Sequence, residues 1–389
     1  MPNSEQSTFK TDVITLTQKM VRTPSLSGDE GGMAELVSLH MRELGFTDIQ
    51  VDENGSVLGI VGPANTEIAV LFDGHMDVVP AVGEWSVAPF GGDIQNGRLY
   101  GRGSTDMKGG LAAAICGVAK AARTGCLQRR VAVSASVMEE VVEGFALASV
   151  LDRCSPQAVI ICEPSKLQIK SGQKGRMEIL AKFQGVSAHA ASPECGENPL
   201  YSAARALVSL QDLTVPTHEL LGDALLVPTD IISTPYPSIS MIPTEAKIRF
   251  DRRTLPGETS EDILAAMEKQ LRSTGHSRFS VSITCDEVQT FTGRCACPPR
   301  WLPAWQIADD HALVLAAMKA VHAAGREPSL GTWRFCTNGS ESAGRRQIPT
   351  IGLGPGHEED AHTVDESIAL DQLEGACVIY RELALELAG

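Results

Sequence analysis

The order of expected strands and helices changes once along this chain, after Gly175, and that change constrains the fold more than any other feature. Up to that point strand-like and helix-like segments alternate, and the run 68–72 is apolar almost throughout. Such a run is typical of a strand that is buried on both faces of a sheet. The alternation therefore predicts an α/β fold, with a mixed sheet and helices on both of its faces.

Beyond Gly175 the expected order becomes strand, helix, strand, strand, helix, strand. The expected segments are strands 177–183, 225–233, 246–254 and 279–285 and helices 199–213 and 260–273. This order is that of a ferredoxin-like α+β unit of about 110 residues. We expect it to be inserted, as residues 176–297, into a larger domain formed by 1–175 and 298–389.

The connection between the two expected parts is unusual in composition. Residues 289–305 are longer than a bare link requires and carry prolines, cysteines and two tryptophans. Trp301 and Trp305 would either pack as a hinge core or shape the substrate pocket.

Length, charge and cysteine content narrow the class of protein. At 389 residues, and roughly 150 residues per domain, the chain should form two or three domains. Its 33 Lys and Arg against 48 Asp and Glu give a net charge of −15, which argues against nucleic acid or an anionic membrane as a partner. No secretory signal pattern and no apolar stretch of about 18 residues is found. The ten cysteines are scattered, so we expect reduced thiols in a cytoplasmic protein.

Short motifs with carboxylates and histidines follow the expected strands, where α/β sheets place their ligand sites. They are His75-Met76-Asp77, the glycine-rich segment 101–110 with Asp106, Glu139-Glu140, Glu163 and, near the C-terminus, His362. Each motif alone is more simply explained as a solvated surface group or a turn. The glycine-rich segment lacks the GxxxxGK and GxGxxG patterns of phosphate-binding loops, and Asp106 would repel a phosphate.

Taken together, the motifs supply five side chains of the types that bind zinc: His75, Asp106, Glu140, Glu163 and His362. Three carboxylates that converge without a cation would be strongly penalised by burial. Two zinc ions would leave a residual positive charge that can acidify a bridging water and polarise a carbonyl. Asp106 is the expected bridging ligand, because its glycine-flanked loop allows the closest approach. Cobalt or manganese would suit the same ligands.

The motifs GHMDVVP, GRGSTDMKGG, MEE, CEP and the late AH resemble, in order and spacing, the co-catalytic zinc amidohydrolases. This family includes acetylornithine deacetylase, succinyl-diaminopimelate desuccinylase, aminoacylase-1 and glutamate carboxypeptidase, and the resemblance spans nearly the whole chain. The segments GQKGRMEI, TWRFCTNG and IGLGPG are most similar to the branch called selenium-metabolism-linked hydrolases. The resemblance implies a zinc exopeptidase-like fold with an inserted lid domain.

The same resemblance implies roles for the motif residues. One metal would be held by His75, Asp106 and Glu163, and the other by His362, Asp106 and Glu140. Asp77, two residues from His75 and on the same side of an extended chain, would accept the imidazole N–H and orient it. Glu139 would act as the general base on the bridging water and then protonate the leaving amine. A cis peptide bond is implied between Asp106 and Met107.

Three further residues are candidates for substrate contact. The resemblance implies that His189, in GVSAH, is an oxyanion donor contributed by the lid of a partner subunit, which implies a homodimer through the lid. A lone histidine after a strand is otherwise an ordinary exposed residue. Arg253 occupies the lid arginine position and suits a substrate carboxylate, although a surface ion pair explains it equally well. Asn338 is the third candidate.

These residues favour a dimeric two-metal hydrolase that cleaves an amide bond in an N-acyl amino acid or a short peptide-like substrate. A hydrolase of N-carbamoyl amino acids would use the same metals with a different pocket. A non-catalytic small-molecule-binding protein on the same fold is the alternative of another class, although every ligand position and the base are present. The acyl group and the amino acid accepted stay open, because motifs do not report pocket shape.

Overall fold

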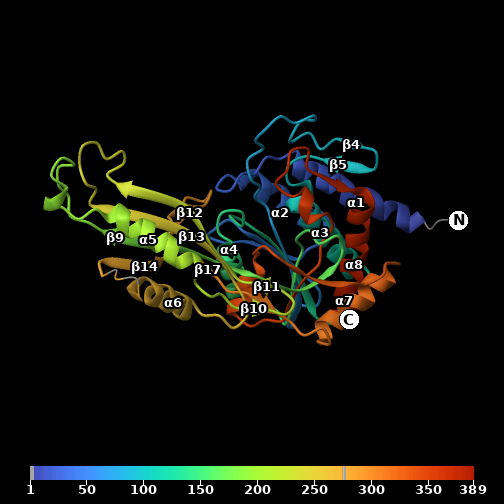
Figure 1. Cartoon of the computed structure of the whole chain (residues 1–389). Coiled ribbons are helices and arrows are strands. Elements are labelled where there is room, and N and C mark those ends of the chain that lie inside the picture. Colours follow the sequence, from blue (N-terminus) through green and yellow to red (C-terminus); the bar gives the residue numbers. More distant parts are fainter. Residues whose placement is uncertain (1–3, 274, 276) are drawn as a thin grey trace.

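The computed structural model describes residues 4–273, 275 and 277–389, and two separate sheets organise them. Figure 1 shows the smaller sheet, with helices α5 and α6 on it, extending away from the larger sheet and its helices. The two sheets have different hydrophobic cores, so each is stabilised largely by its own packing. In this part of the chain no helix is both long and apolar enough to cross a membrane.

The larger sheet is mixed, as predicted. Its strand order is β1-β2-β6-β3-β7-β20-β8-β18, with β19 also paired to β8. Neighbours from β6 to β20 run parallel, whereas the pairs β1–β2, β2–β6, β20–β8 and β8–β18 are antiparallel and β19 runs parallel to β8. The strands are β1 (Asp48–Val51), β2 (Val57–Val61), β3 (Ile68–His75), β6 (Arg130–Ser136), β7 (Val159–Ile161), β8 (Ile169–Gln173), β18 (Trp305–Gln306), β19 (Leu330–Trp333) and β20 (Thr350–Gly352).

Helices cover both faces of this sheet, because its central strands are apolar on both sides. Val70 and Phe72 of β3 point into one core and Leu71 points into the other. The first core is closed by α1 (Ser4–Val21), α2 (Gly31–Leu44), α3 (Gly109–Arg123), α7 (Ala312–Ala323) and α8 (Leu370–Ala388). The second is closed by α4 (Phe145–Arg153) and by Trp333. The predicted α/β arrangement is confirmed.

The smaller sheet has the order β12-β13-β9-β14, with every neighbouring pair antiparallel. Its elements are β9 (Gly175–Gln184), α5 (Pro199–Gln211), β12 (Leu225–Thr234), β13 (Glu245–Thr254), α6 (Ser260–Ser273) and β14 (Phe279–Ile283). Alternate residues of β13 are buried, and they pack with α5 and α6. This is the β-α-β-β-α-β topology expected from the sequence. The domain boundaries at 176 and 297 stay a prediction.

A third, three-stranded sheet was not predicted, because strands of two or three residues are too short to show an alternating pattern. It has the order β21-β5-β4, with β4 (Ile94–Gln95), β5 (Arg98–Tyr100) and β21 (Ser367–Ala369). The remaining short elements are β10 (Thr217–His218), β11 (Gly222–Asp223), β15 (Val288–Gln289), β16 (Cys295–Ala296) and β17 (Trp301–Leu302), with 3-10 or π turns at Ser104–Lys108, Pro193–Cys195, Ser340–Arg345 and Glu358–Asp360.

The connection 289–305 packs against both parts of the molecule. The β15–β16 hairpin places the Phe291 ring directly against the backbone of Gly55, where a Cβ atom would lie 2.1 Å from it. Trp305 is buried, and Trp301 packs against the core of the smaller sheet. Packing is therefore the role that the structure favours for both tryptophans.

The expectation that all ten cysteines are reduced is wrong for one pair. Cys285 and Cys297 form a disulfide, with their Cα atoms 5.4 Å apart. Chain order alone does not reveal this pairing, because the hairpin between the two residues is what returns the chain to the same place. The other eight cysteines are free thiols.

Candidate metal centre

The predicted ligands meet because three of the motifs follow neighbouring parallel strands. β3 lies between β6 and β7 in the larger sheet. His75 ends β3, Glu139 and Glu140 follow β6, and Glu163 follows β7. Since the carboxyl ends of parallel strands share one edge of a sheet, these side chains are brought to the same crevice. Asp106 reaches it from the loop before α3, and His362 from the segment after β20.

The five side chains form two groups that share Asp106. His75 Nε2 lies 3.1 Å from Asp106 Oδ1 and 3.4 Å from Glu163 Oε1. His362 Nε2 lies 2.9 Å from Glu140 Oε2 and 3.2 Å from Asp106 Oδ2. Within each group the potential ligand atoms all lie within 4.8 Å of one another. Asp106 thus turns one oxygen to each group, which is the arrangement that a bridging carboxylate requires.

Asp77 orients several residues of this site. As predicted it contacts His75, but through its main-chain carbonyl more closely than through its carboxylate. His75 Nδ1 is 2.9 Å from the main-chain carbonyl of Asp77, whereas the carboxylate Oδ1 is farther away, at 3.6 Å. The carboxylate instead accepts the amide N–H groups of Glu139 and Glu140, at 3.0 and 3.1 Å. A single buried residue therefore orients the histidine through its backbone and the two glutamates through its side chain.

A buried carboxylate that the sequence analysis missed fixes the Asp106 loop. Glu366 accepts hydrogen bonds from the amides of Gly103, Thr105 and Asp106, at 2.8 to 3.1 Å, and pairs with Arg102 at 2.6 Å. It is brought there because β21, which follows it, pairs with β5. No nearby motif marks Glu366 in the sequence, since the contact joins residues about 260 positions apart. The predicted cis peptide bond between Asp106 and Met107 is present.

The site carries more buried negative charge than its own residues can neutralise. Burial, reinforced by Asp106, raises the pKa of Glu140 to about 7 and that of Glu163 to about 8. Hydrogen bonds with Asp106 and Glu140 raise the pKa of His362 to about 10. Buried Oε1 atoms of Glu139 and Glu140 have no hydrogen-bond partner within the described residues. Crowded, under-satisfied carboxylates beside two imidazoles are the donor set that divalent cations bind.

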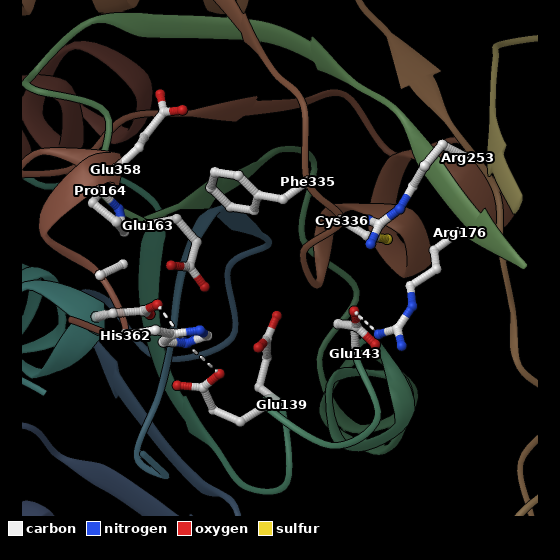
Figure 2. A pocket seen from close by; sticks show the side chains of 13 residues that line it. Glu139, Glu143, Glu163, Pro164, Arg176, Arg253, Phe335, Cys336, Glu358 and His362 are labelled. Atoms are coloured by element: carbon white, nitrogen blue, oxygen red, sulfur yellow. Dashed lines mark hydrogen bonds and ion pairs between the residues drawn. The ribbon is translucent and has the colours of Figure 1, made fainter. Parts of the chain in front are cut away.

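Glu139 is next to this set and not part of either group. Its Oε2 lies 4.0 Å from His75 Nε2, and only 6% of the residue is exposed. Burial raises the pKa of its carboxyl well above the ordinary value. The carboxyl group faces the same pocket as the ligands, which has a volume of about 310 Å³. In Figure 2 the carboxylates of Glu139 and Glu163 both point into this space.

The three predicted substrate contacts are placed very differently. Arg253 lines the pocket together with Arg176, across the space from His362 (Figure 2). Asn338 is buried and does not line this pocket: its amide bonds Asp73, Ser136 and Gly144 within the protein. His189 is exposed and does not line the pocket either. Geometry within one chain therefore supports only Arg253 as a substrate contact.

Comparison with known proteins gives consistent matches along the whole chain. The family model of peptidase family M20/M25/M40 matches residues 71–386. The chain is 30% identical over 386 residues to the uncharacterized protein YgeY of Escherichia coli strain K12, an alignment that covers 97% of this chain and 94% of that protein. It is 27% identical over 398 residues to succinyl-diaminopimelate desuccinylase 2 of Ruegeria sp. strain TM1040, covering 97% of this chain and 95% of that protein.

A similar fold is found in the YXEP protein of Bacillus subtilis, described as a dinuclear metal binding peptidase from the M20 family. Its TM-score to this chain is 0.73 at 15% identity, and the superposition covers 98% of this chain and 99% of that one. At that identity the likeness concerns the fold.

Proposed function

Because the chain belongs to peptidase family M20/M25/M40, and is thereby a metal-dependent hydrolase of amide bonds in peptide-like substrates, we propose that it is a two-zinc enzyme acting on N-acyl amino acids or short peptides. The observation that carries this proposal is the sharing of Asp106 between two ligand groups, each completed by one histidine and one glutamate. A single-metal or purely structural site has no need of the second group.

The residues fit two divalent cations. His75, Asp106 and Glu163 would hold one, and Asp106, Glu140 and His362 the other. Burial, with the charge of Asp106, raises the pKa values of Glu140 and Glu163, and a bound cation would offset this cost of burying their negative charge. When bound, the two cations would polarise the scissile carbonyl and lower the pKa of a water molecule.

Glu139 is the proposed general base and acid. Its carboxyl faces the pocket without being a member of either ligand group, so it is free to accept a proton from the attacking water. It then carries that proton to the nitrogen of the leaving amine. Asp77 supports this role, because its carboxylate fixes the main-chain amide of Glu139.

The proposed substrate class rests on Arg253, which lines the pocket on the side opposite His362. Arg253 Nε and Nη2 are paired with Asp251, at 2.8 and 3.2 Å, and its guanidinium still borders the cavity. A carboxylate on the substrate would be recognised there. Succinyl-diaminopimelate desuccinylase 2, a relative over the whole chain, is named for removing an acyl group from an amino acid, which agrees with this class.

A homodimer through the smaller sheet is the proposed assembly. β12 is the outermost strand of that sheet, and its Val227 and Ile231 are 47% and 49% exposed. His189, which does not reach the pocket of its own chain, would then serve the partner's site as an oxyanion donor. Zinc as the native metal, and the cytoplasm as the location, are part of the same proposal.

The test is a hydrolysis panel on metal-replete protein. N-acyl amino acids, dipeptides and N-carbamoyl amino acids are compared by release of the free amino acid, and the metal content is measured by mass spectrometry. Two zinc ions per chain and turnover of N-acyl or dipeptide substrates are expected. Ammonia release from N-carbamoyl substrates alone would overturn the substrate class, and failure to bind metal would overturn the function.

A further inference from the structure

The loop 138–144, which carries Glu139 and Glu140, is held from two different sides. Its first half is fixed by two carboxylates from segments that flank the larger sheet and its helices. Glu30 Oε1 accepts the amide of Met138 at 3.1 Å, and Asp77 accepts the next two amides. These contacts belong to the same part of the molecule as the metal ligands, so they keep the first half fixed relative to the site.

The second half of the loop has contacts on both sides. Val142 is buried in the core of the larger sheet, and the amide of Gly144 donates to Asn338 Oδ1 at 2.7 Å. Val141 and Glu143, in contrast, are bound by two arginines that belong to the smaller sheet. Arg176, near the start of β9, donates from Nη1 to Glu143 Oε1 at 3.1 Å. Arg300, next to β17, donates from Nη1 to the main-chain carbonyl of Val141. Figure 2 shows Arg176 reaching Glu143 at the side of the pocket away from His362.

Both arginines are firmly built into the smaller sheet. Arg176 also donates from Nη2 to Glu178 at 2.7 Å, and its Nε lies within ion-pair distance of Asp251, at 3.4 Å, without forming a hydrogen bond. Arg300 has only 8% of its surface exposed, and its carbonyl accepts the amide of Glu178 at 3.0 Å. A movement of the smaller sheet would therefore be transmitted to the loop through both side chains.

We propose that Arg176 and Arg300 are positioning residues. They hold the Val141–Glu143 half of the loop and so keep the Glu139 carboxyl at a fixed position relative to the metal ligands. This inference rests on the proposed function, in which Glu139 transfers the proton. Its physical basis is that a displacement of about 1 Å in a reacting group can cost on the order of 100-fold in rate. Orientation of the smaller sheet thereby becomes a determinant of turnover.

Arg176 lines the pocket, so direct substrate binding is the competing explanation for it. Arg300 separates the two explanations, because it does not line that pocket and contacts the loop through the main-chain carbonyl of Val141. Arg249 is a matched control: it pairs with Glu178 at 3.0 Å and with Asp286 at 3.1 Å, and none of its contacts within the described residues involves the loop.

The experiment compares Arg176→Met, Arg300→Met and Arg249→Met in the full-length, zinc-loaded protein. Hydrogen–deuterium exchange of peptides that cover 138–144 is measured together with kcat, KM and metal content. We expect exchange in this segment to rise about 10-fold or more in the first two variants and to stay unchanged in the third. We also expect kcat to fall about 10- to 100-fold with KM changed less than about threefold and two metals retained. Arg176→Lys and Arg300→Lys serve where a methionine variant does not fold, and they should show smaller effects because lysine lacks the guanidinium fork.

Unchanged exchange in the Arg176 and Arg300 variants would overturn the proposal, and so would increased exchange with an unchanged kcat. If KM rises only in Arg176→Met, and Arg300→Met has the exchange and kinetics of the wild type, Arg176 is a substrate ligand and not a positioning residue. If the wild-type protein hydrolyses none of the substrates, the proposed function fails, and the exchange data still decide whether the two arginines hold the loop.

Discussion

The metal centre and the outer strand of the smaller sheet differ in what each exposes or buries within a single chain: one buries negative charge and the other exposes apolar side chains. At the metal centre, buried carboxylates gather beyond what their neighbours can neutralise, and the pKa values of Glu140 and Glu163 rise to about 7 and about 8, first through burial. Along β12, apolar side chains such as Val227 and Ile231 remain about half exposed on a strand with no outer neighbour. A bound cation would offset the buried negative charge, whereas a second protein surface would cover the exposed apolar side chains of the edge strand.

In the proposed assembly the metal centre is completed by cations and the β12 edge by a second copy of the chain, so each region can be perturbed without the other. Removing metal should leave the β12 surface unchanged, and blocking β12 should leave the ligand groups intact. Activity would depend on both only if His189 acts across the dimer.

The largest effect should come from Glu139→Gln. The glutamine has nearly the same shape but cannot accept a proton, so we expect kcat to fall about 1,000-fold, within the range of general acid–base catalysis. Metal content should stay at two per chain, because Glu139 belongs to neither ligand group. Turnover within tenfold of wild type would contradict the assignment of the base.

The next largest effect should follow from blocking the β12 edge with Val227→Lys and Ile231→Lys together. Lysines on an edge strand oppose strand pairing, so the dimer should dissociate, as measured by light scattering after gel filtration. If His189 is an oxyanion donor for the partner, kcat should fall on the order of 100-fold. Leu39→Lys, at a site that is 50% exposed on α2, is the control and should leave the dimer intact. A dimeric double variant would show that β12 is not the interface.

The ligand set could be predicted because its members follow strands. His75, Glu140 and Glu163 lie where a parallel sheet brings its strand ends together, so their order along the chain already implied one site. The ferredoxin-like order was predictable for a similar reason, since half-buried strands such as β13 alternate residue by residue.

The residues that support the site could not be predicted in this way. Glu366 and Glu30 act by accepting hydrogen bonds from main-chain N–H groups. Nearly every residue has such a group, so these contacts leave no pattern in the sequence. Asn338 is a candidate for substrate contact in the sequence, whereas in the structure its side chain bonds Gly144 and Asp73 inside the protein. The disulfide between Cys285 and Cys297 depends on a hairpin whose strands are two residues long.

A smaller effect that sharpens the comparison is the pH dependence of metal affinity. In metal-free protein the carboxyls of Glu140 and Glu163, with pKa values of about 7 and about 8, carry protons that must leave before a cation binds. The ligands His75 and His362 also have raised pKa values and must lose their protons as well. Affinity should therefore rise with pH, by up to about 10-fold between pH 6 and 7 for each proton released. Calorimetry in two buffers of different ionisation enthalpy counts the protons released. An affinity that does not change between pH 6 and 8 would contradict the assignment.

The smallest effect concerns Glu30, a buried carboxyl at the margin of the metal centre that belongs to neither ligand group. Burial, followed by the charge of Asp77, raises its pKa from 4.5 to about 7. The folded state therefore holds this proton more tightly than the unfolded state. The resulting stability is fully present below pH 4.5 and is lost as pH rises through about 7.

Glu30→Gln keeps the acceptor for the amides of Gly28 and Met138 and has no proton to lose. Relative to wild type it should gain up to about 3 kcal/mol in unfolding free energy between pH 5 and pH 8, as measured by urea denaturation of metal-loaded protein. Comparing the two proteins cancels the titration of all other groups. Parallel stability curves would mean that Glu30 is ionised at neutral pH, and the excess of buried negative charge would then extend beyond the residues that cations can reach.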